Sequence, residues 1–196
     1  HAAPGTVVKE VRAPGGFELH ATDLTIIHKS EEFPIGKKEH GPDFLLSNRH
    51  LWLRSPRQIA ILRIRDTLVR NVRDFFYQNG FTLVDTPIFT TTVGEDSTNL
   101  FSVDYFDLGK AYLAQTGQLY LEAAIAALGK VYCFGPTFRA EKSKTRRHLT
   151  EFWMVEGEMA FHDHKQNLEV QENLVSYIVQ KTIAEREHEL LSLERD

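Results

Sequence analysis

The sequence predicts an α+β fold in which an antiparallel sheet is flanked by helices. Two long amphipathic patterns, at residues 56–79 and 164–194, enclose a central part that contains two β-type runs, 131–139 and 151–161, joined by a loop. Runs of strands between helices are typical of α+β folds and not of a doubly wound sheet. The sequence has neither a Walker A motif nor a glycine-rich dinucleotide fingerprint, so we expect any nucleotide to be bound by side chains of the sheet.

The composition is that of a globular protein with a sizeable core. Hydrophobic residues make up 42% and charged residues 26% of 196 residues. The net charge of −4 excludes a generally basic nucleic-acid surface and leaves only local patches. The single cysteine, Cys133, stands in an apolar run, which predicts a small buried residue and suits a reducing, cytoplasmic compartment. We predict no metal site, since the nine histidines lack ligand spacing, and no membrane span.

The N-terminal part alternates in polarity, as exposed strands do. Residues 5–29 contain a Pro-Gly-Gly turn at 14–16, which predicts a β-hairpin followed by a further strand at 24–27. Two or three strands are marginally stable alone, so we expect partner strands elsewhere. The segment after them is rich in Pro, Gly and charge and reads as a linker. The expected domain boundaries are 1–30, 31–52 and 53–196.

The helix predicted at 56–79 has the clearest pattern. Pro56 suits the first turn, apolar residues recur on one face, and Gly80 follows the last turn. We expect a strand at 81–89, in which Pro87 indicates an edge, a bulge or an interface because proline cannot donate to a ladder.

The remaining elements follow from the same kinds of pattern. Short strands are expected at 100–106 and 110–115, and an Ala-rich helix at 118–128 ends at Gly129. The runs 131–139 and 151–161 are predicted to pair with each other before the last helix.

A concentrated positive charge lies between the two paired strands. Residues 139–147 hold five cations and one anion, a local charge of +4: Arg139, Lys142, Lys144, Arg146 and Arg147 against Glu141. A polyphosphate needs such a concentration of cations. A solvated hairpin tip is the alternative, and charge alone does not separate the two.

On these residues the sequence resembles class II aminoacyl-tRNA synthetases of the aspartate/asparagine/lysine subgroup, and within them the bacterial asparaginyl type. Residues 66–90 resemble the first signature motif, which builds the dimer interface, and residues 134–161 the second, with its F-R-x-E core at 138–141. The segment 115–120 (QTGQLY) is similar to the amino-acid-pocket segment. The N-terminal hairpin and residues 38–45 resemble the end of an anticodon-binding barrel of the OB-fold type and the start of the catalytic domain.

The resemblance covers essentially all of the sequence but lacks the glycine-rich third motif of the family. It therefore implies a central part of a longer protein, and we expect this part alone to be inactive. The implied activity is ATP-dependent formation of asparaginyl-adenylate and transfer of asparagine to tRNA. ATP, asparagine and tRNA are the implied ligands, Mg²⁺ is expected with ligands outside this sequence, and a cytoplasmic homodimer is the implied assembly.

The resemblance also implies roles for single residues. Arg139 and Glu141 would be catalytic and ATP-binding, and Phe76 and Pro87 would belong to the dimer interface. Further ATP contacts are implied for Arg147, His148 and Phe152, amino-acid contacts for Gln115, Gln118, Glu156 and Glu158, and contacts with the tRNA acceptor end for Lys144 and Arg146. The loop 94–98 resembles one that closes over the amino acid.

Plainer interpretations exist for several of these residues. Arg139 and Glu141 would also suit a surface ion pair, Phe152 a core position, and the loops a solvated surface. Strand alternation predicts Glu156 and Glu158 on one face of the sheet, where two carboxylates need cations or donors.

The substrate follows from one comparison with the family pattern. Aspartate enzymes carry a Lys at the position of Leu121, so a Leu there, together with Glu156, favours a neutral amide substrate. The alternative functions are an aspartyl-tRNA synthetase, a synthetase-derived asparagine synthetase without the barrel, and an inactive dimerisation or RNA-binding module.

Overall fold

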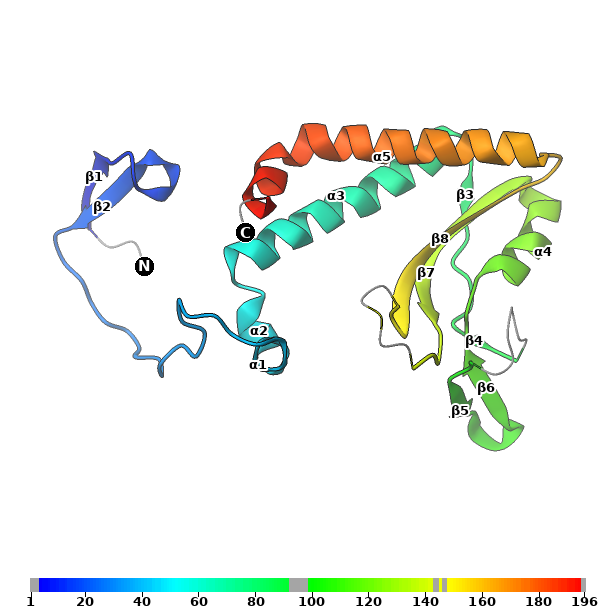
Figure 1. The fold of residues 1–196 in the computed structure, drawn as a ribbon, viewed down its shortest axis with the longest axis horizontal. Helices are drawn as coiled ribbons and strands as arrows, with labels where there is room; N and C mark the ends of the chain where they lie inside the picture. Colours follow the sequence, from blue (N-terminus) through cyan, green and yellow to red (C-terminus); the bar gives the residue numbers. More distant parts are fainter. Residues whose placement is uncertain (1–3, 92–98, 143–144, 146–147, 195–196) are drawn as a thin grey trace. The chain divides into compact units, whose positions relative to one another are not determined.

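The computed structural model describes residues 4–91, 99–142, 145 and 148–194, and the chain forms two compact units, His1–Ser55 and Pro56–Asp196 (Figure 1). The first unit contains strands β1 (Gly5–Lys9) and β2 (Phe17–Ala21), which pair antiparallel around the turn η1 (Pro14–Gly16). The predicted hairpin is thus confirmed. Two short helices follow, α1 (Pro42–Ser47) and α2 (Arg49–Trp52).

The further strand predicted at residues 24–27 is wrong. These residues form no regular structure, although their sequence is apolar. A strand needs a partner for its backbone N–H and C=O groups, and no described strand pairs with this segment.

The second unit holds the remaining helices and strands. They are α3 (Pro56–Gln78), β3 (Thr82–Leu83), β4 (Phe89–Thr90), β5 (Ser102–Asp104), η2 (Phe106–Leu108), β6 (Lys110–Leu113), α4 (Gln118–Leu128), β7 (Lys130–Phe138), β8 (Glu151–Met159) and α5 (His164–Leu193). One sheet has the order β3-β7-β8, with β7 and β8 antiparallel and the short β3 parallel to β7. The other, β4-β6-β5, is antiparallel throughout. The α+β prediction is confirmed.

The single strand predicted at 81–89 is interrupted. Its first part is β3, which pairs with β7, and its last residue begins β4, which pairs with β6 in the other sheet. Pro87 lies between the two pieces and is exposed. Proline has no N–H to give to a ladder, so the chain leaves one sheet and joins the next around it.

The core lies between helix α3 and one face of the β7–β8 pair. Phe76 is 3% exposed, and its ring stacks on Tyr132 with centroids 4.4 Å apart. Val72, Phe75, Phe81 and Tyr132 complete the buried cluster. Gly157 of β8 lies under the same ring, where a Cβ would come within 3.1 Å of it. The sheet therefore approaches α3 closely at this point.

The register of β7 and β8 divides their side chains between two faces. Cys133 lies opposite Glu156 and Thr137 opposite Phe152, and opposite residues of an antiparallel pair share a face. The other face carries Tyr132, Phe134, Val155 and Met159, which pack toward α3 and α5. We call the first face, which carries Cys133, Thr137, Phe152 and Glu156, the front face. Helix α4 covers one end of it through Leu121, which packs with Val131 and Cys133.

Helix α5 is fixed at its start and lies along α3 (Figure 1). Asp163 accepts a hydrogen bond from the Gln166 backbone N–H at 2.8 Å, and the Gln166 side chain accepts one from the Asp163 N–H at 2.9 Å. This capping box satisfies N-terminal donors of the helix. Near Arg186 the backbone departs from helical geometry, with φ −131°.

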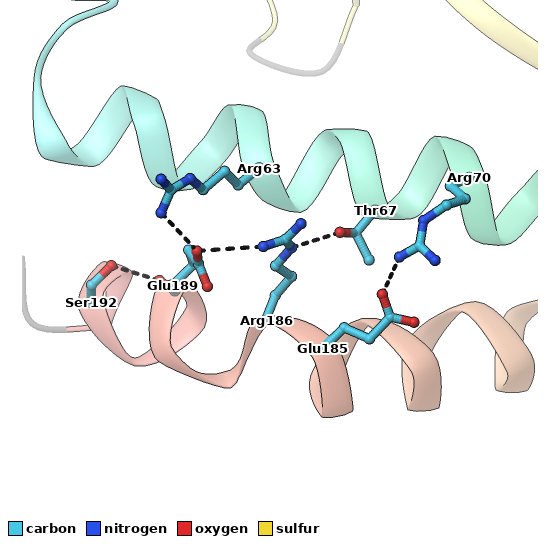
Figure 2. A network of polar contacts seen from close by, with 7 residues as sticks. All are labelled: Arg63, Thr67, Arg70, Glu185, Arg186, Glu189 and Ser192. Atoms are coloured by element: carbon cyan, nitrogen blue, oxygen red, sulfur yellow. Dashed lines mark hydrogen bonds and ion pairs between the residues drawn. The ribbon is translucent and has the colours of Figure 1, made fainter.

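Polar contacts join α5 to α3 near that irregular turn (Figure 2). The Arg186 side chain donates to the Thr67 hydroxyl at 2.7 Å. Glu189 accepts from Arg63 at 3.3 Å and lies 3.7 Å from the Arg186 guanidinium. Arg70 and Glu185 form a further ion pair. Along the described part of the chain, no helix is both long and apolar enough to cross a membrane.

This network predicts that acid weakens the packing of α5 on α3. The pKa of Glu189 is lowered, chiefly by a hydrogen bond from its own backbone N–H and also by Arg63 and Arg186. A carboxylate with a lowered folded-state pKa stabilises the fold above its ordinary value of 4.5, and this contribution is lost as the pH falls through the folded value. Between neutral and acid pH, Glu189→Gln should therefore lose less free energy of unfolding than the wild type.

Urea denaturation at several pH values, followed by circular dichroism, measures this difference. Glu187→Gln, at an exposed position of the same helix, is the matched control. Equal pH dependence in Glu189→Gln and the wild type would contradict the assignment.

Candidate active site

The front face carries an arginine over an aromatic ring at one end. The Arg139 guanidinium carbon lies 5.6 Å from the centroid of the Phe152 ring, a cation–π distance. Arg139 follows directly on β7, and its backbone N–H donates to the Thr150 carbonyl at 3.0 Å. The β-ladder therefore brings both side chains to the same end of the same face.

A cavity of 580 Å³ opens at this end. Among the described residues it is lined by Arg139, Glu141, His148, Leu149 and Phe152. The His148 ring and the Thr145 hydroxyl are hydrogen-bonded to each other. A guanidinium, an imidazole and a half-buried aromatic ring suit a ligand that is both anionic and aromatic, and Glu141 can accept from a donor on that ligand.

At the other end of the front face the Glu156 carboxylate is held by three described donors. The Thr116 hydroxyl donates to Oε1. The Gly117 backbone N–H donates to Oε2 at 2.8 Å, and the Cys133 thiol lies 3.4 Å from the same oxygen. The Thr116 hydroxyl also accepts from the Gln118 N–H at 3.0 Å, which ties the start of α4 to β8.

Cys133 is buried, as the sequence predicts, with 4% of its surface exposed. Burial, with the nearby Glu156 charge and the hydrogen bond to it, raises the pKa of this thiol to about 12, although a hydrogen bond with Thr86 acts in the opposite sense. Cys133 is therefore a neutral thiol at physiological pH and can donate a hydrogen bond.

Acidic side chains gather around Glu156. Burial raises the pKa of Glu158, and the charges of Glu122 and Glu156 raise it further. Glu122 also accepts from the Gln118 side-chain amide at 2.8 Å. A cation bound here would lower the pKa of Glu158 again, so this region favours a ligand with a positive group.

A smaller cleft of 220 Å³ lies beside these residues. Thr86, Pro87, Gln115, Thr116 and Gly117 are among the residues that line it. Gln115 is 6% exposed, and its amide donates to the Asn99 carbonyl at 3.2 Å. Its Oε1 atom has no hydrogen-bond partner among the described residues, so it is free to accept from a ligand.

Apart from Gln115 in the cleft, the residues predicted for function fall into four groups. The structure brings Arg139, Glu141, His148 and Phe152 to one cavity and Glu156, Glu158 and Gln118 to the start of α4. Phe76 lies inside the core and Pro87 is exposed, and their part in a dimer stays a prediction. Lys144, Arg146, Arg147 and the loop 94–98 lie outside the described residues.

Sequence reasoning missed the donors that hold Glu156. Thr116 and Gly117 stand inside the segment recognised from the family, but no local pattern connects them to a residue 40 or 39 positions away. Their signal was a hydroxyl and a glycine directly before a helix, and a glycine there indicates a close backbone approach.

Comparisons with known proteins show which family this chain is similar to. The family of class II tRNA synthetases (D, K and N) matches residues 41–195. An asparagine–tRNA ligase from Chloroflexus aurantiacus is 58% identical over 192 residues, and one from Pelotomaculum thermopropionicum is 59% identical over the same length. In both cases the match covers 98% of this chain and 44% of the relative.

A solved structure is similar as well. The chain superimposes on asparaginyl-tRNA synthetase from Pyrococcus horikoshii complexed with asparaginyl-adenylate with a TM-score of 0.90 and 45% identity. This match covers 96% of the chain and 44% of the archaeal protein. The chain thus spans less than half the length of these relatives, and the similarity expected from the sequence is confirmed.

The close packing around Glu156 predicts that Gly117 does not tolerate a side chain. A Cβ at residue 117 would lie 2.7 Å from the Cys133 sulfur and 3.0 Å from Thr86. Because these atoms would have to shift, Gly117→Ala should destabilise the fold by about 1–3 kcal/mol. Gly135→Ala on the same face is the control, since a Cβ there meets no atom within 4 Å. Chemical denaturation compares the two variants, and equal stabilities would contradict the prediction.

Proposed function

Since the chain belongs to the class II tRNA synthetases of the D, K and N family, we propose that the whole protein is an asparagine–tRNA ligase. It activates asparagine with ATP and transfers it to tRNA. The observation that carries this proposal is the front face of β7–β8, on which the Arg139–Phe152 pair and the Glu156 carboxylate are four strand residues apart. That spacing corresponds to about 13 Å, a reach suited to an amino acid joined to a nucleotide.

The reaction has two steps. In the first, a carboxylate oxygen of asparagine attacks the α-phosphorus of ATP, the bond from that phosphorus to the bridging oxygen breaks, and pyrophosphate leaves. In the second, a hydroxyl of the terminal tRNA adenosine attacks the activated carbonyl, and AMP leaves. Neither step needs a protein nucleophile. Both need aligned substrates and cations facing the negative charge that develops.

Arg139 would stabilise the first step. Its planar guanidinium can hold an α-phosphate oxygen and the asparagine carboxylate together, which a lysine ammonium cannot do in a bidentate manner. In the structure the guanidinium lies over Phe152. We infer that it turns from the ring to the phosphate while the adenine stacks on the ring.

Other residues of the cavity would bind the rest of the nucleotide. Glu141 would accept from the adenine amino group or orient Arg139, and His148 with Arg147 would contact the β- and γ-phosphates. Lys144 and Arg146 would meet the acceptor end of tRNA. The cavity shared by Arg139, Glu141, His148 and Phe152 supports the nucleotide assignment.

The amino acid would bind around Glu156. We propose that Glu156 accepts from the side-chain amide of asparagine, with Gln115, Gln118 and Glu158 around the rest of the substrate. The free Oε1 atom of Gln115 and the raised pKa of Glu158 support a ligand that donates hydrogen bonds and carries an ammonium group. Leu121 is fully buried at the position where aspartate enzymes carry a lysine, so it offers no cation for a substrate carboxylate.

We further propose a cytoplasmic homodimer with Phe76 and Pro87 at or behind its interface. Magnesium would accompany ATP. The described ranges contain no group of three or more His, Cys, Asp and Glu side chains that could hold a metal ion, and we propose that the protein ligands of Mg²⁺ lie outside this chain.

The role of Arg139 predicts a graded loss of activation. In the full-length protein, Arg139→Ala should lower kcat/KM for asparagine-dependent ATP–pyrophosphate exchange by about 10²–10³-fold, the cost of removing a group that stabilises developing charge. Arg139→Lys should recover only part of it because the bidentate geometry is lost. Lys142→Ala, at an exposed position of the same loop, is the control. Full activity in Arg139→Ala would rule out the role.

Substrate choice gives the test that separates the alternatives. The full-length protein should prefer asparagine over aspartate in pyrophosphate exchange by about 10³-fold or more, because an aspartate side chain has no donor for Glu156 and meets its negative charge. Glu156→Gln should lower this preference because its kcat/KM for asparagine falls. A wild type that activates aspartate equally well would favour an aspartyl-tRNA synthetase, and one that activates neither would favour an inactive module.

A further inference from the structure

We propose that Cys133 is a positioning residue that makes Glu156 selective for an amide. Its thiol, with Thr116 and Gly117, fixes the carboxylate so that one acceptor site stays open for the substrate. This inference rests on the proposed function, since it names how the amino-acid pocket distinguishes its ligand.

The hydrogen bonds of Glu156 are distributed unequally between its two oxygens. Each carboxylate oxygen has about two lone-pair sites. Oε2 receives both the Gly117 N–H at 2.8 Å and the Cys133 thiol at 3.4 Å, so both of its sites are used. Oε1 receives the Thr116 hydroxyl. With the donors of the described residues counted, one site therefore stays open on Oε1, and a substrate amide can donate to it.

A rigid carboxylate is needed for this purpose. A glutamate has three side-chain torsions, and ordering it on binding would cost free energy that the substrate contacts must offset. With Oε2 bound from two directions, the carboxylate plane cannot turn without breaking one of these bonds. Cys133 supplies the second direction because it lies directly opposite Glu156 in the β7–β8 ladder.

The surroundings of Cys133 suit a thiol at this position. The sulfur is packed between Gly117, Leu121 and Val131, and Leu121 and Val131 are both fully buried. Apart from Thr86 and Glu156 the named neighbours are apolar, so a stronger donor would be more costly to desolvate, and the close approach to Gly117 leaves no room for a longer side chain. Since the raised pKa keeps the sulfur protonated, it donates to Glu156 and does not repel it.

The structural arrangement has a consequence for specificity. Asparagine gains from an oriented acceptor, whereas aspartate presents oxygen atoms to an anion and gains nothing from its orientation. Loss of the thiol should therefore weaken the binding of asparagine and leave the binding of aspartate as weak as before. The ratio of kcat/KM for asparagine to kcat/KM for aspartate should then fall. If Cys133 merely filled space, its loss would weaken the binding of ATP and of both amino acids together.

The test uses pyrophosphate exchange by the full-length protein with asparagine, aspartate and ATP varied in turn. Cys133→Ala should raise KM for asparagine about tenfold, the lower end expected for a hydrogen bond to a charged group since S–H is a weak donor. KM for ATP should change less than about twofold, and the asparagine-to-aspartate ratio of kcat/KM should fall about tenfold. Cys133→Ser keeps a donor of similar size and should return KM for asparagine to within about threefold of the wild type.

Val131→Ala is the matched control for the cavity that truncation of a buried side chain leaves in the core. It removes a buried side chain from the same strand and the same apolar cluster but leaves every described donor of Glu156 in place. It should lower the free energy of unfolding while leaving KM for asparagine unchanged. A rise in KM for asparagine equal to that of Cys133→Ala would show that packing, and not the thiol, sets the affinity.

The outcomes separate this inference from the proposed function. A wild type that shows no asparagine-dependent exchange overturns both. A wild type that activates asparagine, together with an unchanged KM in Cys133→Ala or an impaired Cys133→Ser, overturns the positioning role alone. If Cys133→Ala does not fold, the serine variant decides: recovery within about threefold supports the donor, and a larger rise overturns it.

Discussion

Strands β7 and β8 pair with Cys133 opposite Glu156 and Thr137 opposite Phe152. All other features of the candidate site depend on this register, because side chains alternate between the two faces of a strand pair. A slip of β8 by one residue would turn Glu156 toward the apolar core, and a slip of β7 would bring Tyr132 to the front face. Packing in the core disfavours such a slip. Phe76 stacks on Tyr132 and lies against Gly157, so the face of the sheet that packs on α3 fits this helix only in the observed register. Packing on one side of the sheet thus specifies chemistry on the other.

The charged groups at the two ends of the front face are stabilised in different ways. Arg139 lies beside an open cavity, over an aromatic ring, where water and a ligand can reach it. Glu156 is partly buried among Thr116, Gly117 and Cys133, where a bare carboxylate would be costly and donors must compensate it. An open cation suits a ligand that arrives and leaves with its own charge, as a nucleotide does. A fixed anion suits recognition of a single group, because its geometry is set before the ligand binds.

Sequence patterns predicted correctly the elements whose formation depends on residues near one another in the sequence. The helix at 56–79 followed from its apolar period and its Pro and Gly boundaries, and the paired runs around the basic loop became β7 and β8. The wrong predictions concern segments whose structure depends on pairing with residues far away in the sequence. Residues 24–27 are apolar but lack a partner strand, and the run around Pro87 is divided because its two ends pair with different sheets. Likewise, Glu156 could be assigned from its place in a strand, but its bond to Cys133 depends on a register that no single segment encodes.

The contact between α3 and α5 shows why so many polar residues are buried behind this site. Thr67 and Asn71 are almost completely buried on α3, and Thr182 and Glu189 are buried on α5. An apolar interface would be at least as stable, since buried polar groups contribute little net free energy once desolvation is counted. Apolar rows, however, slide by a turn at small cost, whereas the bonds from Arg186 to Thr67 and from Arg63 to Glu189 hold only in one alignment (Figure 2). We infer that the network serves alignment: α5 continues directly from β8, so its position along α3 also fixes where β8 ends and, through the ladder, where Glu156 lies.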